Sequence, residues 1–262
     1  MPIKTVVCED NAALISTALQ SVVALIDGEQ KRNTTTVGEL QSRVSLALSG
    51  GSTPKALYAA MKAHHLPLAS SAVQYYFGDV RMVPDSSPDS NFLMAFEQLL
   101  HAVPTKHVTK IETVDISAAD SAAAFEAALL TQLPLNESGC PQFDIVLLGV
   151  GPDGHTASLF PGTPASKETE RFAVPCMPNE GITPYVERVT ITRRVIQAAR
   201  HVIVMAAGKD KQWVLDGILA SDEDVASTEN FRVPVARLLR ECTGDVQLLV
   251  NRDMVKDGAA SL

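Results

Sequence analysis

Short apolar runs alternate along the chain with longer segments in which apolar residues recur every three or four positions. A run that is apolar at nearly every position suits a β-strand buried on both faces, whereas the wider spacing suits a helix with one buried face. The runs predict strands at residues 5–8, 44–48, 73–77, 145–149, 201–206 and 246–250. The spaced segments predict helices at residues 12–26, 54–63, 91–101, 118–133, 209–219 and 234–240.

This alternation predicts an α/β fold. We expect an open, mostly parallel twisted sheet flanked by helices on both faces, a Rossmann-like arrangement of three layers. The chain has no internal repeat and no low-complexity tract. Residues 28–38 and the proline-rich residues 161–184 are predicted to be exposed loops, not linkers between domains. The sequence therefore predicts a single α/β domain over residues 1–262.

The composition is that of a globular protein and excludes several other classes. Of the 262 residues, 46% are apolar and 20% are charged, which is unlike a disordered chain. No apolar run approaches the roughly 18–20 residues that cross a bilayer, and the N-terminus lacks the pattern of a secretion signal. The net charge of −8 comes without a stripe of Lys and Arg, so neither nucleic acid nor a membrane is an expected partner.

The cysteines predict a reducing compartment. They lie far apart with no CxxC spacing, so neither a disulfide framework nor a zinc site is indicated. We expect a monomer in the cytoplasm. The C-terminal Ala260, Ser261 and Leu262 loosely resemble the peroxisomal S-K-L address without its basic residue, and a peroxisome-like organelle is the alternative.

The first segment that carries chemistry is residues 49–54, SGGSTP, which follow a predicted buried strand. Gly50 and Gly51 let the backbone approach a ligand closely, and Ser52 and Thr53 precede a proline suited to the first turn of a helix. Thr53 is the expected N-cap. Free N–H groups at such a helix start attract anions, so a phosphate group is the expected ligand. A plain strand-to-helix turn is the alternative.

The second segment places an acid and a guanidinium after the next predicted strand. Asp79 and Arg81 follow residues 73–77. In open α/β sheets, ligands bind beyond the carboxyl ends of the strands, where such side chains converge. The alternative is a loop salt bridge, with Asp89 or Ser90 capping the helix that follows.

The third segment is the glycine-rich stretch LLGVGPDGHTASLFPG at residues 147–162. It is not a dinucleotide fingerprint, because His155 follows the third glycine and no acidic residue closes a second strand roughly 20 residues on. Asp153 can orient the His155 imidazole and stabilise its cation, which makes a general base. A structural loop histidine is the alternative. The other histidines are scattered, so no metal site is indicated.

Together the three segments resemble the 6-phosphogluconolactonases, within the superfamily that includes the glucosamine-6-phosphate isomerases. The matching motifs are SGGSTP, then GDxRxVP with DSN, then GVGPDGHTASLFPG, and the similarity spans most of the chain. Residues 184–190 and 208–211 resemble the family's P…RVT strand and G-x-x-K turn. The resemblance implies that Arg188 and Lys211 bind a sugar phosphate beside the Gly50-to-Thr53 loop, where a dianion would meet two cations and helix N–H groups.

The resemblance further implies hydrolysis of 6-phospho-D-glucono-1,5-lactone to 6-phospho-D-gluconate in the oxidative pentose phosphate pathway, without metal or organic cofactor. Lactone opening needs an activated water, a stabilised oxyanion and a proton for the leaving oxygen. His155 can supply the first and the last, with Asp153 holding its ring. Arg81 or N–H groups of the glycine loop would stabilise the oxyanion, and Asp79 would position sugar hydroxyls or Arg81.

Two departures and two alternatives accompany this expectation. Val80 stands where the lactonases commonly carry Glu, and Phe160 stands where the amino-sugar isomerases carry a glutamate before Pro-Gly. A phenyl ring cannot move protons, so hydrolysis is favoured over isomerisation. One alternative is an amino-sugar phosphate isomerase or deaminase with Asp79 as the base. The other is a non-catalytic sugar-phosphate sensor, which would survive the loss of His155.

Overall fold

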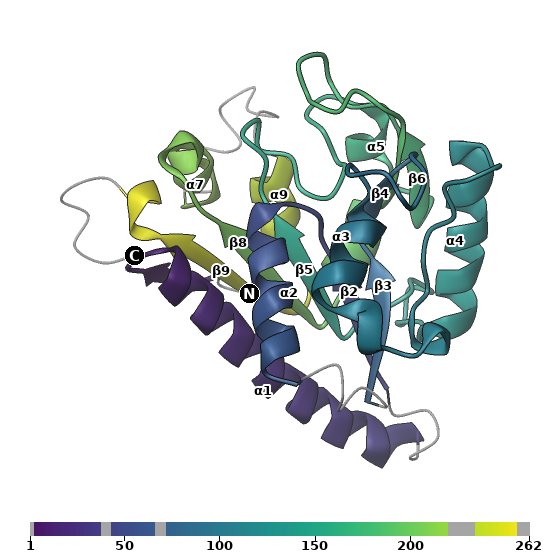
Figure 1. Ribbon diagram of the computed structural model, residues 1–262, viewed down its shortest axis with the longest axis horizontal. Helices are drawn as coiled ribbons and strands as arrows, with labels where there is room; N and C mark the ends of the chain where they lie inside the picture. Colours follow the sequence, from purple (N-terminus) through teal and green to yellow (C-terminus); the bar gives the residue numbers. More distant parts are fainter. Residues whose placement is uncertain (1–2, 38–42, 66–71, 220–233, 256–262) are drawn as a thin grey trace.

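The computed structural model describes residues 3–37, 43–65, 72–219 and 234–255. Six parallel strands form the main sheet in the order β1-β9-β8-β5-β2-β3, seen between the helices in Figure 1. Each predicted strand is confirmed to within one residue at its ends. The strands are β1 (Lys4–Cys8), β2 (Val44–Leu48), β3 (Val73–Phe77), β5 (Ile145–Gly149), β8 (His201–Ala206) and β9 (Asp245–Asn251).

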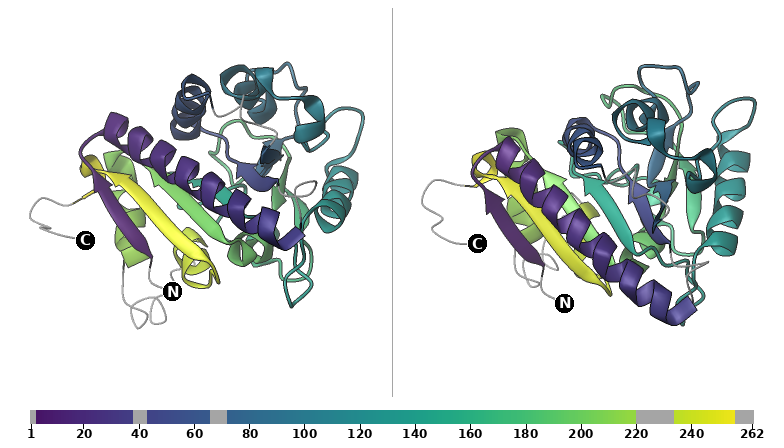
Figure 2. Two further views of the ribbon diagram at one scale, coloured as in Figure 1. Left: turned by 90° about the horizontal axis from the view of Figure 1, so that it is seen from below. Right: turned by 60° about the horizontal axis from the view of Figure 1, so that its bottom comes forward.

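Helices cover both faces of the main sheet, which confirms the expected three layers. One face carries α1 (Asn11–Val37), α2 (Ser52–Ala63) and α3 (Asn91–Gln98). The other face carries α7 (Gln212–Leu219) and α9 (Pro234–Arg240), as Figure 2 shows, and α6 (Arg193–Ala198) packs against α9. Short 3-10 turns follow several elements, at Leu100–Ala102, Thr105–His107, Lys209–Lys211 and Arg252–Met254.

Helix α1 extends further than the sequence predicted. The expectation of a loop at residues 28–38 is wrong for residues 28–37, which belong to this helix. Gly and Thr are weak helix formers, but tertiary contacts hold the end of this helix. Arg32 Nη2 lies 2.8 Å from Asp144 Oδ1, and Asn33 Nδ2 lies 3.4 Å from Asp144 Oδ2. These bonds to a buried carboxylate outweigh the low helix propensity of the segment.

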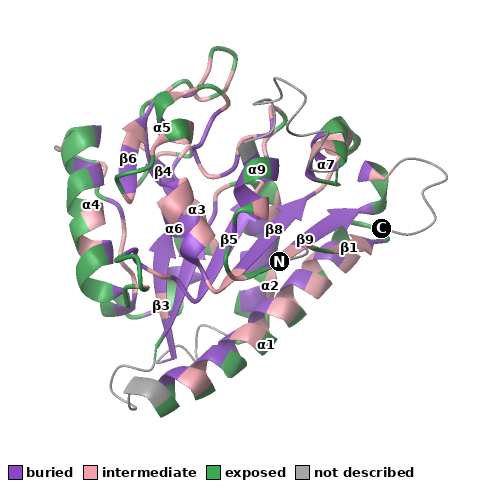
Figure 3. Ribbon diagram, turned by 180° about the vertical axis from the view of Figure 1, so that it is seen from behind, coloured by how far each residue is buried: buried purple, intermediate pink, exposed green. Residues whose placement is uncertain are grey.

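Helix α1 is, by length and composition alone, apolar enough to cross a membrane. In the fold, Leu14, Ala18, Val22 and Ile26 recur every four residues and are buried against the sheet. The opposite side of the helix is exposed, as the alternation of buried and exposed residues in Figure 3 shows. This is the pattern of an amphipathic helix that covers a sheet.

The amino end of the main sheet is held by a buried carboxylate. Asp144, just before β5, accepts hydrogen bonds from the backbone N–H of Ser45 at 2.8 Å and from the Ser45 hydroxyl at 2.9 Å. Burial raises the pKa of Asp144, and the bonds from Ser45 oppose that rise. Strands β2 and β5 are therefore fixed side by side at the end opposite to their carboxyl-terminal loops.

A second, antiparallel sheet of three strands was not predicted as a separate unit. It consists of β4 (Asp79–Arg81), β7 (Arg188–Ile191) and β6 (Ala173–Cys176), with α4 (Ala118–Gln132) packed against it. The expectation that residues 161–184 form an exposed loop is wrong in part, because α5 (Pro164–Lys167) and the mostly buried β6 lie within them.

Gly78 joins the two sheets. Its N–H donates to the carbonyl of Leu48 at the end of β2, and its carbonyl accepts from the N–H of Ile191 at the end of β7, both at 2.8 Å. The chain then enters β4, so Asp79 and Arg81 lie on a strand and not in a loop. Because side chains alternate along a strand, the two point to one side and Val80, 3% exposed, points to the other.

Candidate active site

A pocket of about 230 Å³ lies where the carboxyl ends of β2, β5 and β8 meet the second sheet. Strands β2 and β5 are neighbours, yet the chain runs from β2 outward to β3 and only then crosses back to β5, so this is the point where the strand order reverses. Ligands of open α/β sheets bind at such a point. The pocket brings together every predicted site residue except Asp153: Gly50, Gly51, Ser52, Thr53, Asp79, Arg81, His155, Arg188 and Lys211.

The glycine loop begins α2 two residues earlier than expected. Gly51 has φ of 108°, a conformation that favours glycine, and it is the N-cap of a helix that starts at Ser52. The prediction of Thr53 as the N-cap is therefore wrong, and Thr53 lies in the first turn. No side chain caps this helix start. The first-turn N–H groups thus remain available to a ligand in the pocket.

Gly50 is required for a different reason, which is close packing against Asn91. A Cβ atom at Gly50 would lie 2.6 Å from Asn91 Oδ1. Asn91 is buried, and its Nδ2 donates to the backbone carbonyl of Asp79 at 3.0 Å. Sequence reasoning did not assign Asn91 to the site, although it lies within the DSN motif. The side chain of Asn91 connects the glycine loop to the strand that carries Asp79.

Asp79 is 5% exposed, and its Oδ2 accepts a hydrogen bond from the hydroxyl of Ser158 at 2.6 Å. Arg81 lines the same pocket, and its Nη1 donates to the carbonyl of Asp89 at 3.0 Å. Ser90 caps α3 by accepting from the N–H of Leu93. The contacts that the alternative interpretation expected, between Arg81 and Asp89 and at the Ser90 cap, are therefore present. They hold Arg81 at the pocket.

Arg188 is a buried cation that lies opposite Arg81 in the register of β4 and β7. Its Nη2 donates to the carbonyl of Pro184 at 3.3 Å, and its Nε has no hydrogen-bond partner. Burial lowers the pKa of Arg188, and the carboxylate of Asp79 opposes that effect. Within the described ranges no carboxylate forms an ion pair with Arg188. Because buried charges are normally paired, this is typical of a cation that binds an anionic ligand.

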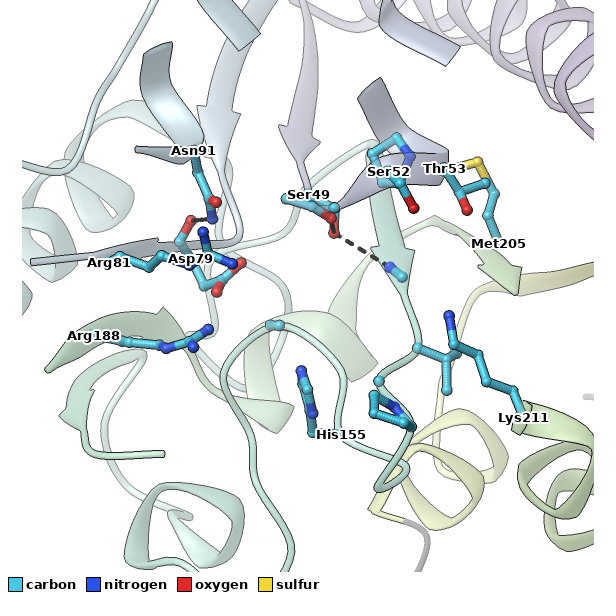
Figure 4. Close-up of a pocket in the computed structure, with 18 residues that line it drawn as sticks. Ser49, Ser52, Thr53, Asp79, Arg81, Asn91, His155, Arg188, Met205 and Lys211 are labelled. Atoms are coloured by element: carbon cyan, nitrogen blue, oxygen red, sulfur yellow. Dashed lines mark hydrogen bonds between the residues drawn. The ribbon is translucent and has the colours of Figure 1, made fainter. Parts of the chain in front are cut away.

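His155 points into the pocket from the loop after β5 (Figure 4). Its Nδ1 is hydrogen bonded to Asp153 Oδ1, and no described residue bonds to Nε2. Burial acts to raise the pKa of Asp153, but the hydrogen bond and charge of His155, together with backbone N–H groups, outweigh this and the pKa is lowered. Asp153 does not itself line the pocket. It fixes the ring of His155, as a carboxylate behind a general base does.

Phe160 lies beneath this histidine and does not line the pocket. It is fully buried, with its ring centroid 4.6 Å from that of His155 and 5.1 Å from the Arg188 guanidinium carbon. The phenyl ring therefore packs against the loop that carries His155.

Lys211 enters the pocket from the side opposite to Arg188, as Figure 4 shows. It ends the 3-10 turn Lys209–Lys211, whose N-cap, Gly208, has φ of 110°. Trp213, one residue into the next helix, donates from Nε1 to the carbonyl of Pro152 at 3.2 Å. The turn that carries Lys211 is thus tied to the loop that carries His155. In the part of the chain that is described, no group of three His, Cys, Asp or Glu could hold a metal ion.

The model of the family described as glucosamine-6-phosphate isomerases/6-phosphogluconolactonase matches residues 9–247. The chain belongs to this family. A 6-phosphogluconolactonase of Nostoc is 38% identical over 240 residues, which cover 90% of this chain and 94% of the relative. The human 6-phosphogluconolactonase is 33% identical over 187 residues, which cover 70% of this chain and 71% of the relative.

Solved structures agree with the family assignment. The 6-phosphogluconolactonase from Trypanosoma brucei superposes with a TM-score of 0.85 at 38% identity and covers 97% of both chains. The one from Leishmania guyanensis has the same TM-score at 35% identity and covers 100% of both chains. A monomeric glucosamine-6-phosphate deaminase superposes with a TM-score of 0.72 at 16% identity, which shows only that the fold is shared. Within the family, the site must therefore decide between the two chemistries.

We expect Gly50→Ala to weaken binding of 6-phosphogluconate by about tenfold or more and to lower the free energy of unfolding by about 1–3 kcal/mol, because the added methyl must displace Asn91. Calorimetric binding and denaturant unfolding measure the two effects. Gly28→Ala is the matched control, since a Cβ there meets no atom within 4 Å and Gly28 lies in α1. A Gly50→Ala variant that binds and unfolds like the control variant would contradict the packing argument.

Proposed function

We propose that this chain is a 6-phosphogluconolactonase that hydrolyses 6-phospho-D-glucono-1,5-lactone to 6-phospho-D-gluconate in the oxidative pentose phosphate pathway. The observation that carries the proposal is a pocket that brings His155, its ring bonded to Asp153, together with Arg188 and Lys211. The pocket thus combines a candidate general base with cations that can bind a dianion. The names of the relatives supply the substrate, and the residues supply a chemistry that suits it.

The phosphate would be held by Arg188, Lys211 and the uncapped N–H groups that follow Gly51. Charge-assisted hydrogen bonds to a phosphate are stronger than neutral ones. The helix dipole adds a favourable field at the start of α2. Because the phosphate does not react, these groups would serve to bind and orient the substrate. The lactone carbonyl would then lie toward His155.

In the proposed reaction, Nε2 of His155 takes a proton from a water molecule as that water attacks the lactone carbonyl. Asp153, whose lowered pKa keeps it ionised at neutral pH, stabilises the imidazolium that forms. Arg81 or N–H groups of the glycine loop stabilise the oxyanion of the tetrahedral intermediate. His155 then returns the proton to the ring oxygen as the C–O bond breaks, so the base is regenerated.

Phe160 favours hydrolysis over the isomerase alternative. Isomerisation of an amino-sugar phosphate moves a proton between adjacent carbons and assists ring opening, which calls for a carboxylate near His155 in addition to Asp79. Here Asp153 already holds one side of the His155 ring, and at the place of the isomerases' glutamate the neighbour of His155 is the buried phenyl ring of Phe160. Val80, the second departure from the lactonase pattern, is buried on the side of β4 opposite to Asp79 and Arg81 and does not line the pocket. Its substitution for Glu leaves the proposed chemistry intact.

We further propose that the protein acts in the cytoplasm, as a monomer and without a cofactor. The cytoplasmic assignment rests on the absence of paired cysteines, since the four in the sequence are free and buried. The peroxisome-like address, Ala260 to Leu262, lies outside the described residues.

His155→Ala should lower kcat for the phosphorylated lactone by on the order of 10² or more, the usual scale for removing a general base. The measurement is acid release from freshly made lactone, with spontaneous opening subtracted. His101→Ala is the matched control, because His101 is an exposed histidine outside the pocket. Wild-type turnover in the His155→Ala variant would remove the general base from the proposal. Retained ligand binding without any turnover in the wild-type chain would favour the sensor.

Lys211→Ala should raise KM for the phosphorylated lactone by about tenfold or more, because it removes a charge-assisted contact to the phosphate. Unphosphorylated gluconolactone should be hydrolysed at an unchanged rate. Lys209→Ala provides the control, since Lys209 lies in the same turn, is exposed and does not line the pocket. Equal losses for both lactones, or equal effects of both variants, would show that Lys211 does not bind the phosphate.

A further inference from the structure

Ser158 lies directly behind the pocket and contributes to it through another residue. Its side chain is fully buried and does not line the pocket. Its hydroxyl donates to Asp79 Oδ2 at 2.6 Å, across 79 positions of sequence. A hydrogen bond this short to a carboxylate is of the charge-assisted kind, which is about twice as strong as a neutral one. Neither the proposed reaction nor the sequence analysis gives Ser158 a role.

Ser158 is itself held at both ends of its backbone. Its N–H donates to the hydroxyl of Thr190 at 3.2 Å, and its carbonyl accepts from the thiol of Cys176 at 3.2 Å. Thr190 is fully buried and lies opposite Asp79 in the register of β4 and β7. The donor that meets Asp79 is therefore fixed by the same small sheet that carries Asp79. Such a donor leaves the carboxylate little freedom to rotate.

The hydrogen bond from Ser158 divides the two oxygens of Asp79 between protein and pocket. An ionised carboxylate can only accept hydrogen bonds. Oδ2 is occupied by Ser158, and no described residue donates to Oδ1. Asp79 lines the pocket (Figure 4), so Oδ1 is the acceptor that a ligand can reach. A ligand with a hydroxyl at that place satisfies this oxygen, whereas one without it leaves a nearly buried charge without a donor.

We propose that Ser158 is a positioning residue of the substrate site, which fixes Asp79 so that Oδ1 accepts a hydrogen bond from a sugar hydroxyl and so selects polyhydroxylated ligands over the bare phosphate group. The identity of the ligand rests on the proposed function. The position of Oδ1 does not, because it follows from the contacts of Ser158. Phosphate capture by Arg188 and Lys211 does not depend on this bond.

Ser45 offers a matched control within the same chain. Its hydroxyl donates to Oδ2 of the buried Asp144 at 2.9 Å, so it makes the same kind of bond. Asp144 lies before β5, at the amino end of the sheet and away from the pocket. A role of Ser158 in stability alone would be reproduced by Ser45→Ala. A role in ligand selection would not.

The first test compares binding of 6-phosphogluconate and of inorganic phosphate by calorimetry. Ser158→Ala should weaken binding of 6-phosphogluconate by about tenfold, as expected for a lost charge-assisted contact. It should change the affinity for inorganic phosphate by less than about twofold. Ser45→Ala should change neither. Should Ser158→Ala fail to fold, Ser158→Cys keeps a weaker donor in a similar volume and should show a smaller selective loss. Equal losses of affinity for both ligands in Ser158→Ala would overturn the proposal. So would the same selective loss of 6-phosphogluconate binding in Ser45→Ala.

A double-mutant cycle tests whether Ser158 acts through Asp79. In an Asp79→Ala background, adding Ser158→Ala should lower kcat/KM for the phosphorylated lactone by less than about twofold further, because the bond is already lost. Additive losses would show that Ser158 acts by another route and would overturn the proposal. A wild-type chain that opens no lactone would contradict the proposed function instead, and the ratio of the two binding affinities would still decide the role of Ser158.

Discussion

The two hydrogen bonds of Gly78 are the constraint on which the site depends. They hold the end of β2 in the main sheet against the end of β7 in the small sheet, each at 2.8 Å. A Cβ atom at Gly78 would lie 3.3 Å from the Leu48 carbonyl, so the close approach leaves little space for a side chain. The main sheet supplies the glycine loop and the loop of His155, and the small sheet supplies Asp79, Arg81 and Arg188. Without this junction, the two halves of the pocket would not face each other.

The charges of the pocket are arranged for an anion. Arg81 and Arg188 are neighbours across β4 and β7, and like charges at that separation repel each other. Asp79 lies among them, but its carboxylate is bonded to Ser158 and not paired with either guanidinium. A bound phosphate would relieve the repulsion and give Arg188 the partner that its Nε lacks. His155 and Asp153 form a separate pair, so in the proposed reaction substrate binding and proton transfer would fall to different groups.

The main sheet could be predicted from the sequence because most of its strands are buried on both faces and read as continuous apolar runs. The small sheet could not. β4 has three residues, too few to show a period of two, and β6 contains Pro175, which fits only because β6 pairs with β7 alone. The end of α1 and the early start of α2 were also missed. The first depends on the buried Asp144, and the second on the positive φ of Gly51.

The site shows the same division. Glycines, a histidine and charged residues at the ends of strands are visible as motifs, and the predicted site residues other than Asp153 line one pocket. Asn91 and Ser158 were not predicted, because each acts by a hydrogen bond to Asp79 from 12 or 79 positions away. Their signal lies in motifs that sequence reasoning used only for resemblance, DSN and HTASLFPG. Distant polar contacts of this kind are set by the fold and not by local pattern.

The most direct test of the central claim offers the purified protein two substrates that carry the same phosphate. We expect it to open 6-phosphogluconolactone well above the spontaneous rate and to release no ammonia from glucosamine 6-phosphate, since Phe160 stands beside His155 where isomerisation needs a carboxylate. Ammonia release at a rate comparable to lactone opening would contradict the account and would make Asp79 the principal base.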